Sequence, residues 1–323
     1  MISKINKLLL IITISLSVSS CGSLINKIAV KSTGGILSSA SDEVLQEGNW
    51  EAFYYGVPGN LKLMEGLFFI VPDDRNILSS LIKGYAGYAF VVNETLALDE
   101  EYNEADLKPN HDQAIFNYSK AVSYGDKFLA TYDLSFEAIS KATKNPKKLA
   151  KMLKSMGTSK FELETLFFVA QAYGGLILFN RDDMSLVAKR PMVQAIFDHV
   201  CGIMPDINSG ACDIFYGANL VLTPAMMGGD PDKGQEIFEK AMKKYPDNYF
   251  IRSAYMQFYA IPFEEEEVYE ENLKFLSRKE KEFKARLEFN PNRKDNRRSN
   301  LNLFQAVAFK RLEIMKRHSS NFF

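Results

Sequence analysis

Apolar residues recur every three or four positions along most of this chain, which is the period of an amphipathic helix. This pattern predicts helices over residues 60–71, 77–98, 111–130, 161–179, 191–204, 215–227, 233–245, 249–260 and 301–316, with a charged helix that reaches residue 288. The sequence contains no alternating apolar and polar run bounded by hairpin turns, so we expect few strands or none. The fold class predicted is all-α.

Four of these helices share one spacing of residue types. The pattern begins with a small residue and continues with a bulky apolar or aromatic residue four positions later, a small or apolar residue three positions after that, and a helix-ending residue five positions further on. The copies are Gly234/Phe238/Ala241/Pro246, Val193/Phe197/Val200/Pro205, Asn60/Met64/Leu67/Pro72 and the degenerate Ala114/Tyr118/Ala121/Asp126. This spacing is typical of the second helix of a tetratricopeptide (TPR) repeat, where a small residue lets paired helices approach and proline ends the helix. Helix-rich chains also produce such spacings by chance, which stays an alternative.

The distances between the copies are irregular, so an irregular TPR-like array (an α-solenoid or bundle) with insertions is the favoured interpretation. We expect this array over residues 41–261, followed by a charged C-terminal helical extension over residues 262–323.

The N-terminal residues have the pattern of an export signal. Two lysines precede an apolar run over residues 8–16, which is about half the length of a membrane span, and Val-Ser-Ser precedes Cys21. This ending resembles a bacterial lipobox, so we predict a signal peptide over residues 1–20, lipid attachment at Cys21 and a tether over residues 21–40. The expected location is the bacterial cell envelope, with the chain anchored to the inner or outer membrane and facing the periplasm. An ordinary signal peptide with a chance cysteine is the alternative.

Charge and motifs exclude several function classes. The chain has 39 basic and 40 acidic residues, so no global field favours nucleic acid, and an exported chain does not meet it. Nucleophile-elbow, phosphate-loop and zinc-protease motifs are absent from the sequence, and its three histidines are far apart. We therefore expect no catalytic residue, metal or cofactor. An exported enzyme with a helical fold is the competing hypothesis.

Besides Cys21, the chain has two cysteines, Cys201 and Cys212, which are eleven residues apart. An oxidising compartment permits a disulfide between them that would join the end of one helix to the start of the next. Two buried free thiols packed as small hydrophobes are nearly as probable an outcome.

Aromatic residues are frequent, with 24 Phe and 15 Tyr. Most belong to the core, but tyrosine has an apolar body and a polar tip that suit a binding surface. The candidates for a ligand or partner surface are Trp50, Tyr54, Tyr85, Tyr88, Tyr173 and Tyr216.

Three segments resemble a known family. They are Asn49 to Pro58 (Asn-Trp-Glu-Ala-Phe-Tyr-Tyr-Gly-Val-Pro), the Gly-Tyr-Ala-Gly-Tyr-Ala run at 84–89, and Gly228 to Gly234 (Gly-Gly-Asp-Pro-Asp-Lys-Gly). Over residues 41–261 the chain resembles the T-component lipoproteins of TRAP (tripartite ATP-independent periplasmic) transporters. The resemblance implies a non-enzymatic, lipid-anchored protein that forms a ring-like homo-oligomer, a trimer, with a hydrophobic pore. It also implies binding of a periplasmic solute-binding protein and of a hydrophobic ligand during solute uptake. A general TPR scaffold for cell-envelope assembly is the alternative.

Overall fold

The computed structural model describes residues 29–35, 43–288 and 299–323, and it contains no strand within these ranges. The all-α prediction is confirmed. The predicted signal peptide and Cys21 lie outside the described residues. The elements are α2 (Trp50–Ile70), α3 (Arg75–Tyr88), η1 (Ala89–Asn93), α4 (Glu94–Tyr102), α5 (Pro109–Ala130), α6 (Phe136–Ala142), α7 (Pro146–Ser155), α8 (Lys160–Phe179), α9 (Met184–Val187), α10 (Arg190–Ile203), η2 (Ile207–Ser209), α11 (Ala211–Leu222), η3 (Ala225–Met227), α12 (Pro231–Lys244), α13 (Phe250–Tyr255), η4 (Met256–Ala260), α14 (Glu266–Leu287), α15 (Asn302–Arg317) and η5 (Ser319–Asn321).

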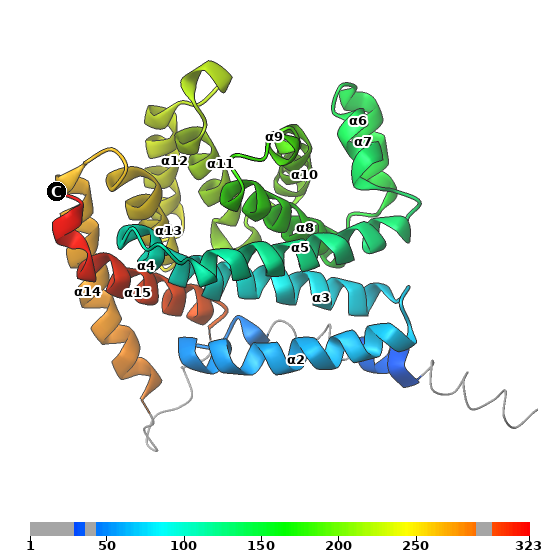
Figure 1. Ribbon diagram of the computed structural model, residues 1–323, viewed down its shortest axis with the longest axis horizontal. Coiled ribbons are helices and arrows are strands. Elements are labelled where there is room, and N and C mark those ends of the chain that lie inside the picture. Colours follow the sequence, from blue (N-terminus) through cyan, green and yellow to red (C-terminus); the bar gives the residue numbers. More distant parts are fainter. Residues whose placement is uncertain (1–28, 36–42, 289–298) are drawn as a thin grey trace, which may run out of the picture.

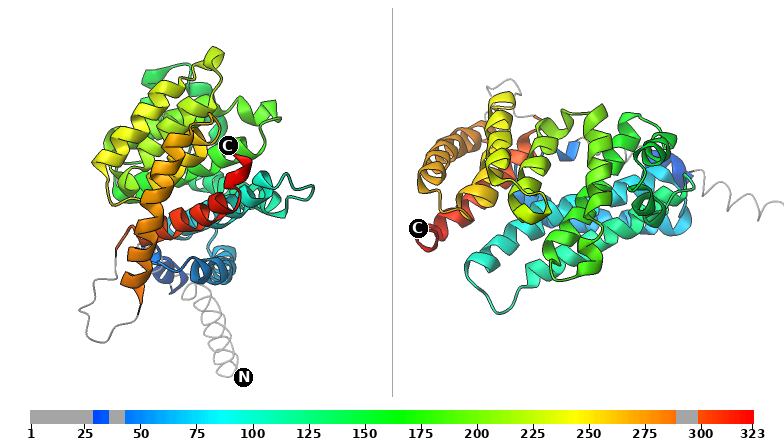
Figure 2. Two further views of the ribbon diagram at one scale, coloured as in Figure 1. Left: turned by 90° about the vertical axis from the view of Figure 1, so that its left-hand side faces the viewer. Right: turned by 90° about the horizontal axis from the view of Figure 1, so that it is seen from above.

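The helices pack in layers (Figures 1 and 2), and they bury two hydrophobic cores. In the first core, α2 packs on α3, α3 on α5, α5 on α8 and α8 on α10. The second core joins α11 to α15 with η1 and the start of α2. Helix α8 is long and apolar enough to span a membrane, but half of its most apolar stretch is buried among its neighbours, as in the core helix of a soluble protein.

Helix α2 begins ten residues before the predicted start at residue 60 and passes through Pro58. Proline has no N–H to donate to the carbonyl four residues earlier, which here belongs to Tyr54. The Tyr88 hydroxyl, on the next helix, donates to that carbonyl over 3.3 Å. A contact between two helices therefore supplies the donor that proline lacks. The local sequence around Pro58 could not show this contact, because Tyr88 lies thirty residues further along the chain.

The small residue of the best repeat copy lies where two helices come close. A Cβ atom at Gly234 would be 2.5 Å from Cγ2 of Val221 and 2.9 Å from the carbonyl oxygen of Gly217, so α11 and α12 could not approach with a larger residue there. Phe238 and Ala241 of the same copy are buried. The copy therefore marks a close helix pair, and the assignment of the whole array to TPR repeats stays a prediction.

Arg311 on α15 connects the two cores, and none of its side chain is exposed. Its Nη2 donates to the Phe90 carbonyl over 3.0 Å and to Oε2 of Glu94 over 3.2 Å, while Nη1 donates to Oε1 of Gln257 over 2.8 Å. Phe90 and Gln257 belong to the π-helical turns η1 and η4. On the far side of Glu94, the Tyr118 hydroxyl of α5 donates to Oε1. One side chain thus fixes α15, η1, α4 and η4 relative to one another.

We predict that Arg311→Met lowers the free energy of unfolding by about 3 to 5 kcal/mol, because it leaves the buried Glu94 carboxylate without its cation. Urea denaturation measures the change. The double variant Arg311→Met/Glu94→Gln should recover part of the loss, because a neutral amide costs less to bury. Equal destabilisation of the single and double variants would show that the charge pair is not the cause.

Candidate ligand cavity

A cavity of about 970 Å³ lies between the two cores. Its wall combines side chains of the first core, such as Leu61, Phe167 and Phe197, with side chains of the second, such as Phe53 and Phe250. Most of the lining is apolar. A volume and lining of this kind match sites for small molecules, which combine apolar walls with a few polar groups.

Glycines leave part of this space open. Gly87 on α3 and Gly174 on α8 line the cavity; an added Cβ would meet no atom within 4 Å at Gly87 and only Cγ1 of Val193, at 3.7 Å, at Gly174. Their neighbours Gly84 and Gly175 have a different role, because an added Cβ would be 2.5 Å from Leu61 and 2.4 Å from Tyr118 respectively. One glycine of each pair lets helices pack closely, and the other keeps the cavity wide.

One polar cluster in the cavity wall is formed by α3 and α8. Nζ of Lys83 is 2.6 Å from Oε2 of Glu164, and both side chains are largely buried. Lys160 lies 3.5 Å from the other carboxylate oxygen. The hydroxyl of Ser80, also in the lining, is buried without a hydrogen-bond partner.

A second polar group lies where α10 faces α11. Nη2 of Arg190 donates to Oδ1 of Asn219 over 2.9 Å and to the Thr223 hydroxyl, and Asn219 donates in turn to Oε1 of Gln194 over 3.2 Å. These neutral partners hold the guanidinium in place without neutralising its charge. Arg190, Asn219 and Gln194 all line the cavity.

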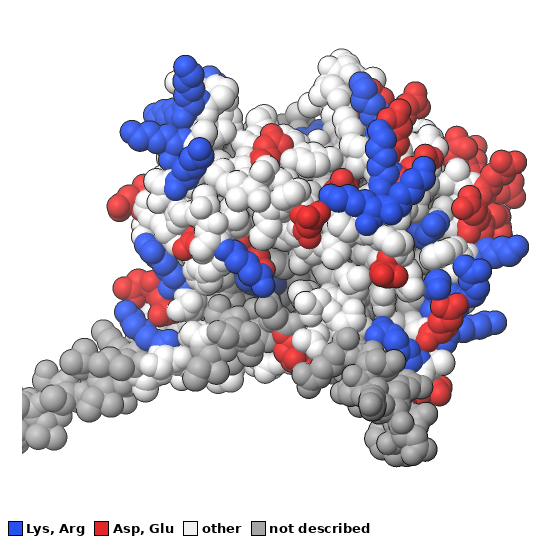
Figure 3. Space-filling model, turned by 180° about the vertical axis from the view of Figure 1, so that it is seen from behind, with Lys and Arg blue, Asp and Glu red and all other residues white. Residues whose placement is uncertain are grey.

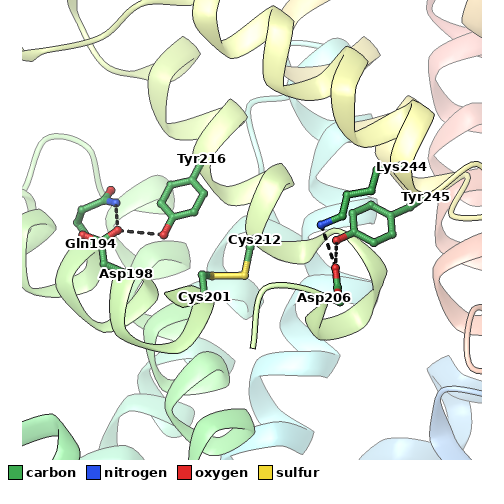
Figure 4. Close-up of a disulfide and its surroundings, with 8 residues drawn as sticks. All are labelled: Gln194, Asp198, Cys201, Asp206, Cys212, Tyr216, Lys244 and Tyr245. Atoms are coloured by element: carbon green, nitrogen blue, oxygen red, sulfur yellow. Dashed lines mark hydrogen bonds and ion pairs between the residues drawn. A yellow bond between two sulfur atoms is a disulfide. The ribbon is translucent and has the colours of Figure 1, made fainter. Parts of the chain in front are cut away.

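A disulfide joins Cys201, near the end of α10, to Cys212, at the start of α11, with an Sγ–Sγ distance of 2.06 Å (Figure 4). The next turns of these helices carry Phe197 and Phe215, whose rings stack with centroids 3.5 Å apart and line the cavity. The disulfide therefore closes the corner of one cavity wall.

Hydrogen bonds surround this corner on both sides (Figure 4). The hydroxyl of Tyr216 donates to Oδ1 of Asp198 over 2.9 Å, and that of Tyr245 donates to Oδ1 of Asp206 over 2.6 Å. Lys244 pairs with the same Asp206 oxygen at 2.9 Å. Bonds from Tyr245 and Lys244 lower the pKa of Asp206. These contacts connect α10 to α11 and the loop after α10 to α12.

None of the six predicted surface residues lines the cavity. Trp50, Tyr54 and Tyr88 lie together where α2 meets α3: the Trp50 indole stacks on Tyr54 and donates from Nε1 to the Val91 carbonyl over 2.9 Å. Burial raises the pKa of Tyr88 to about 12, with a smaller contribution from Tyr54. These rings connect helices to one another.

The other three candidates are also held by protein partners. Tyr85 and Tyr124 both donate to Oε1 of Glu65, at 2.8 and 3.0 Å, and Lys120 reaches the same oxygen at 2.6 Å. Burial raises the pKa of Glu65, but bonds from Lys120, Lys62, Tyr85 and Tyr124 outweigh it and lower that pKa to about 2. Tyr173 packs edge-on against Phe136, and Tyr216 bonds Asp198.

The sequence did contain a signal for the cavity. Glycine is unfavourable inside a helix, so the pairs at 84/87 and 174/175 in apolar helices indicate either close packing or space for something else. Among the described residues, no group of three or more metal-ligating side chains gathers anywhere.

The family model described as "TRAP transporter T-component" matches residues 51–323, which is 273 of the 323 residues. The family resemblance read from three short segments is thus confirmed, and the match continues through α14 and α15, beyond the segments that suggested it. No curated protein is similar enough to the chain to add to this match.

Removal of the Cys201–Cys212 bond tests the wall of the cavity. We predict that Cys201→Ala/Cys212→Ala lowers the free energy of unfolding by about 3 kcal/mol, the value that chain entropy gives for a short loop. Denaturant unfolding measures the change. Mass spectrometry of the unreduced wild-type protein should detect the cross-linked peptide, whereas two freely alkylated thiols would contradict the bond.

Proposed function

Because the chain belongs to the TRAP transporter T-component family, we propose that it is a non-enzymatic lipoprotein of the bacterial envelope that binds a solute-binding protein and a hydrophobic ligand during solute uptake. The family match supports a transport role in association with other transporter components. The cavity between the two cores is the observation that carries the ligand part of the proposal.

The cavity favours a ligand with a long apolar body. Its wall is mostly aliphatic and aromatic, and its polar side chains include the Lys83–Glu164 pair and the Arg190–Asn219 network. Desolvation of an apolar molecule in a largely preformed space supplies the binding energy, and the polar groups orient it. The alternative of a general scaffold for envelope assembly offers no use for such a cavity.

We place the anchor at Cys21 and the assembly in the periplasm as a homo-oligomer, a trimer. The lipobox-like Val-Ser-Ser-Cys sequence supports the anchor. Exposed apolar side chains on α2 support an assembly, since Phe69 is 88% exposed and Tyr55 77% exposed in the single chain. Single soluble chains seldom leave several such residues on one helix uncovered.

Filling the cavity tests the ligand proposal. Gly87→Leu places a side chain in the open space beside α3, and we expect at least about a tenfold weaker affinity for N-phenyl-1-naphthylamine, a neutral apolar fluorescent probe. Fluorescence titration, with displacement by decane, measures the affinity. The matched control is Gly66→Leu on the exposed face of α2, where an added Cβ also meets nothing within 4 Å.

Both variants should gain about 0.5 to 1 kcal/mol of helix stability, because leucine is a better helix former than glycine. The control should bind the probe like the wild type. Unchanged probe binding by Gly87→Leu would contradict the assignment of the cavity as the ligand site.

Size measurement tests the transport proposal. We expect the purified full-length chain in detergent to elute as a small oligomer and to shift to a larger mass when the solute-binding protein of its own TRAP system is added. Size-exclusion chromatography with light scattering gives both masses. A monomer that ignores every candidate solute-binding protein would end the proposal.

A further inference from the structure

The hairpin formed by α6 and α7 carries an unusual concentration of positive charge. Residues 141–160 contain seven lysines and no aspartate or glutamate, although the whole chain has a net charge of −1. The hairpin projects from the body of the molecule at the right of Figure 1, and it appears as a blue projection at the upper left of Figure 3.

Most of these lysines have no acidic partner among the residues that the structure describes. The ion pairs found in the described part of the chain include Lys141 with Glu137 and Lys160 with Glu164, but none of the five lysines between them. These five are exposed, namely Lys144, Lys147, Lys148, Lys151 and Lys154. Elsewhere, lysines on charged helices are commonly paired: Lys240 of α12 with Glu236, and Lys284 of α14 with Glu280. Within the described residues, the hairpin therefore concentrates lysines that no acidic side chain pairs with.

The base of the projecting hairpin also packs against the body of the molecule. Its inner face buries Ile139, Ala142 and Leu153, which are at most 3% exposed. The Asn145 side chain caps the start of α7 by accepting from the backbone N–H of Lys148 over 3.1 Å. A fixed backbone presents the charges together, so an opposing surface meets them without first ordering a loop.

The charges act as one field. The ten residues of α7 span about 15 Å, so neighbouring lysines lie within or close to the screening length of about 8 Å at physiological salt. A field of this kind accelerates association with an acidic surface and sets its orientation more than it adds contact energy.

The position of the hairpin favours a protein over a membrane as the partner. The first described residues, 29–35, lie beside α2, on the opposite side of the molecule from the hairpin (Figure 1). Cys21 is eight residues before Ala29, a chain length that reaches at most about 29 Å. With the anchor at Cys21, the tether joins the molecule on the α2 side, away from the lysines.

We propose that the outer face of the α6–α7 hairpin is the docking surface for an acidic face of the solute-binding protein. This inference rests on the proposed function, and it adds where the partner binds and which chemistry recognises it. Ligand binding in the cavity is not required for it.

The test compares two variants that each remove four positive charges. One is Lys144→Gln/Lys147→Gln/Lys148→Gln/Lys151→Gln on α7 and the turn before it, and the matched control is Lys240→Gln/Lys243→Gln/Lys281→Gln/Lys284→Gln on α12 and α14. All eight side chains are exposed, so both variants should fold. Circular dichroism and thermal unfolding check this. Biolayer interferometry then measures binding of the full-length chain to the purified solute-binding protein of its own TRAP system.

We expect the hairpin variant to associate at least about tenfold more slowly than the wild type at about 0.05 M salt, with the difference nearly lost at about 0.5 M. The control should stay within about threefold of the wild type. If the wild type binds and the hairpin variant binds equally fast, the docking surface is wrong and the proposed function stands. If the wild type does not bind, both fail.

Binding to lipid vesicles tests the remaining possibility, that the lysines bind an anionic lipid surface and not a protein. The hairpin would be assigned to a lipid surface if two results came together: the wild-type chain binds phosphatidylglycerol vesicles through these lysines, and the same substitutions leave binding of the solute-binding protein unchanged. These two results would overturn the proposal. Vesicles of phosphatidylcholine alone provide the uncharged control.

Discussion

The structure depends on a guanidinium buried where two hydrophobic cores meet. Burial of Arg311 is costly unless its N–H groups find acceptors, and here they find the Phe90 carbonyl, Thr95, Gln257 and the Glu94 carboxylate. The backbone register of a π-turn differs from that of the α-helix on either side, so carbonyls of η1 accept from side chains: Phe90 from Arg311 and Val91 from Trp50. Two turns that are unusual in a helix are thus fixed by donors from distant parts of the chain.

This connection explains why a large apolar cavity persists. Phe90 and Glu94 belong both to the Arg311 network and to the cavity wall, and Val91, also in the wall, accepts from Trp50. The wall therefore cannot move inward here without breaking buried hydrogen bonds. On the opposite side, the Cys201–Cys212 bond holds α10 and α11 together. Each core is closely packed on its own, and the space between them is kept by polar and covalent restraints. Apolar packing alone favours filling such a space.

The periodicity of the sequence predicted most helices because burial of one face follows directly from residue spacing. It failed where a distant residue decides the outcome. The helix predicted from residue 60 begins at Trp50 and passes through Pro58, and Tyr88 donates to the carbonyl that proline leaves free. The aromatic candidates were chosen on residue type alone, which does not show that Trp50 and Tyr85 are buried with protein partners; their role as a binding surface stays a prediction. Helices α6 and α7 are short and rich in lysine, so their stability comes from Leu153 and its buried neighbours, a contribution that local composition does not show.

The cavity and the lysine hairpin have different physical requirements, and the fold separates them. An apolar ligand needs an apolar wall, which the side chains of the two cores provide, whereas charge recognition needs exposed side chains that keep their hydration until the partner arrives. Helix α8 links the two, because Phe167 and Gly174 face the cavity while Lys160 continues the basic segment at its N-terminal end. If α8 is rigid, docking at the hairpin can change the cavity wall only by moving the whole helix as one body. Since α8 packs on both α5 and α10, such a shift is opposed by both, and the two binding events are expected to be energetically independent.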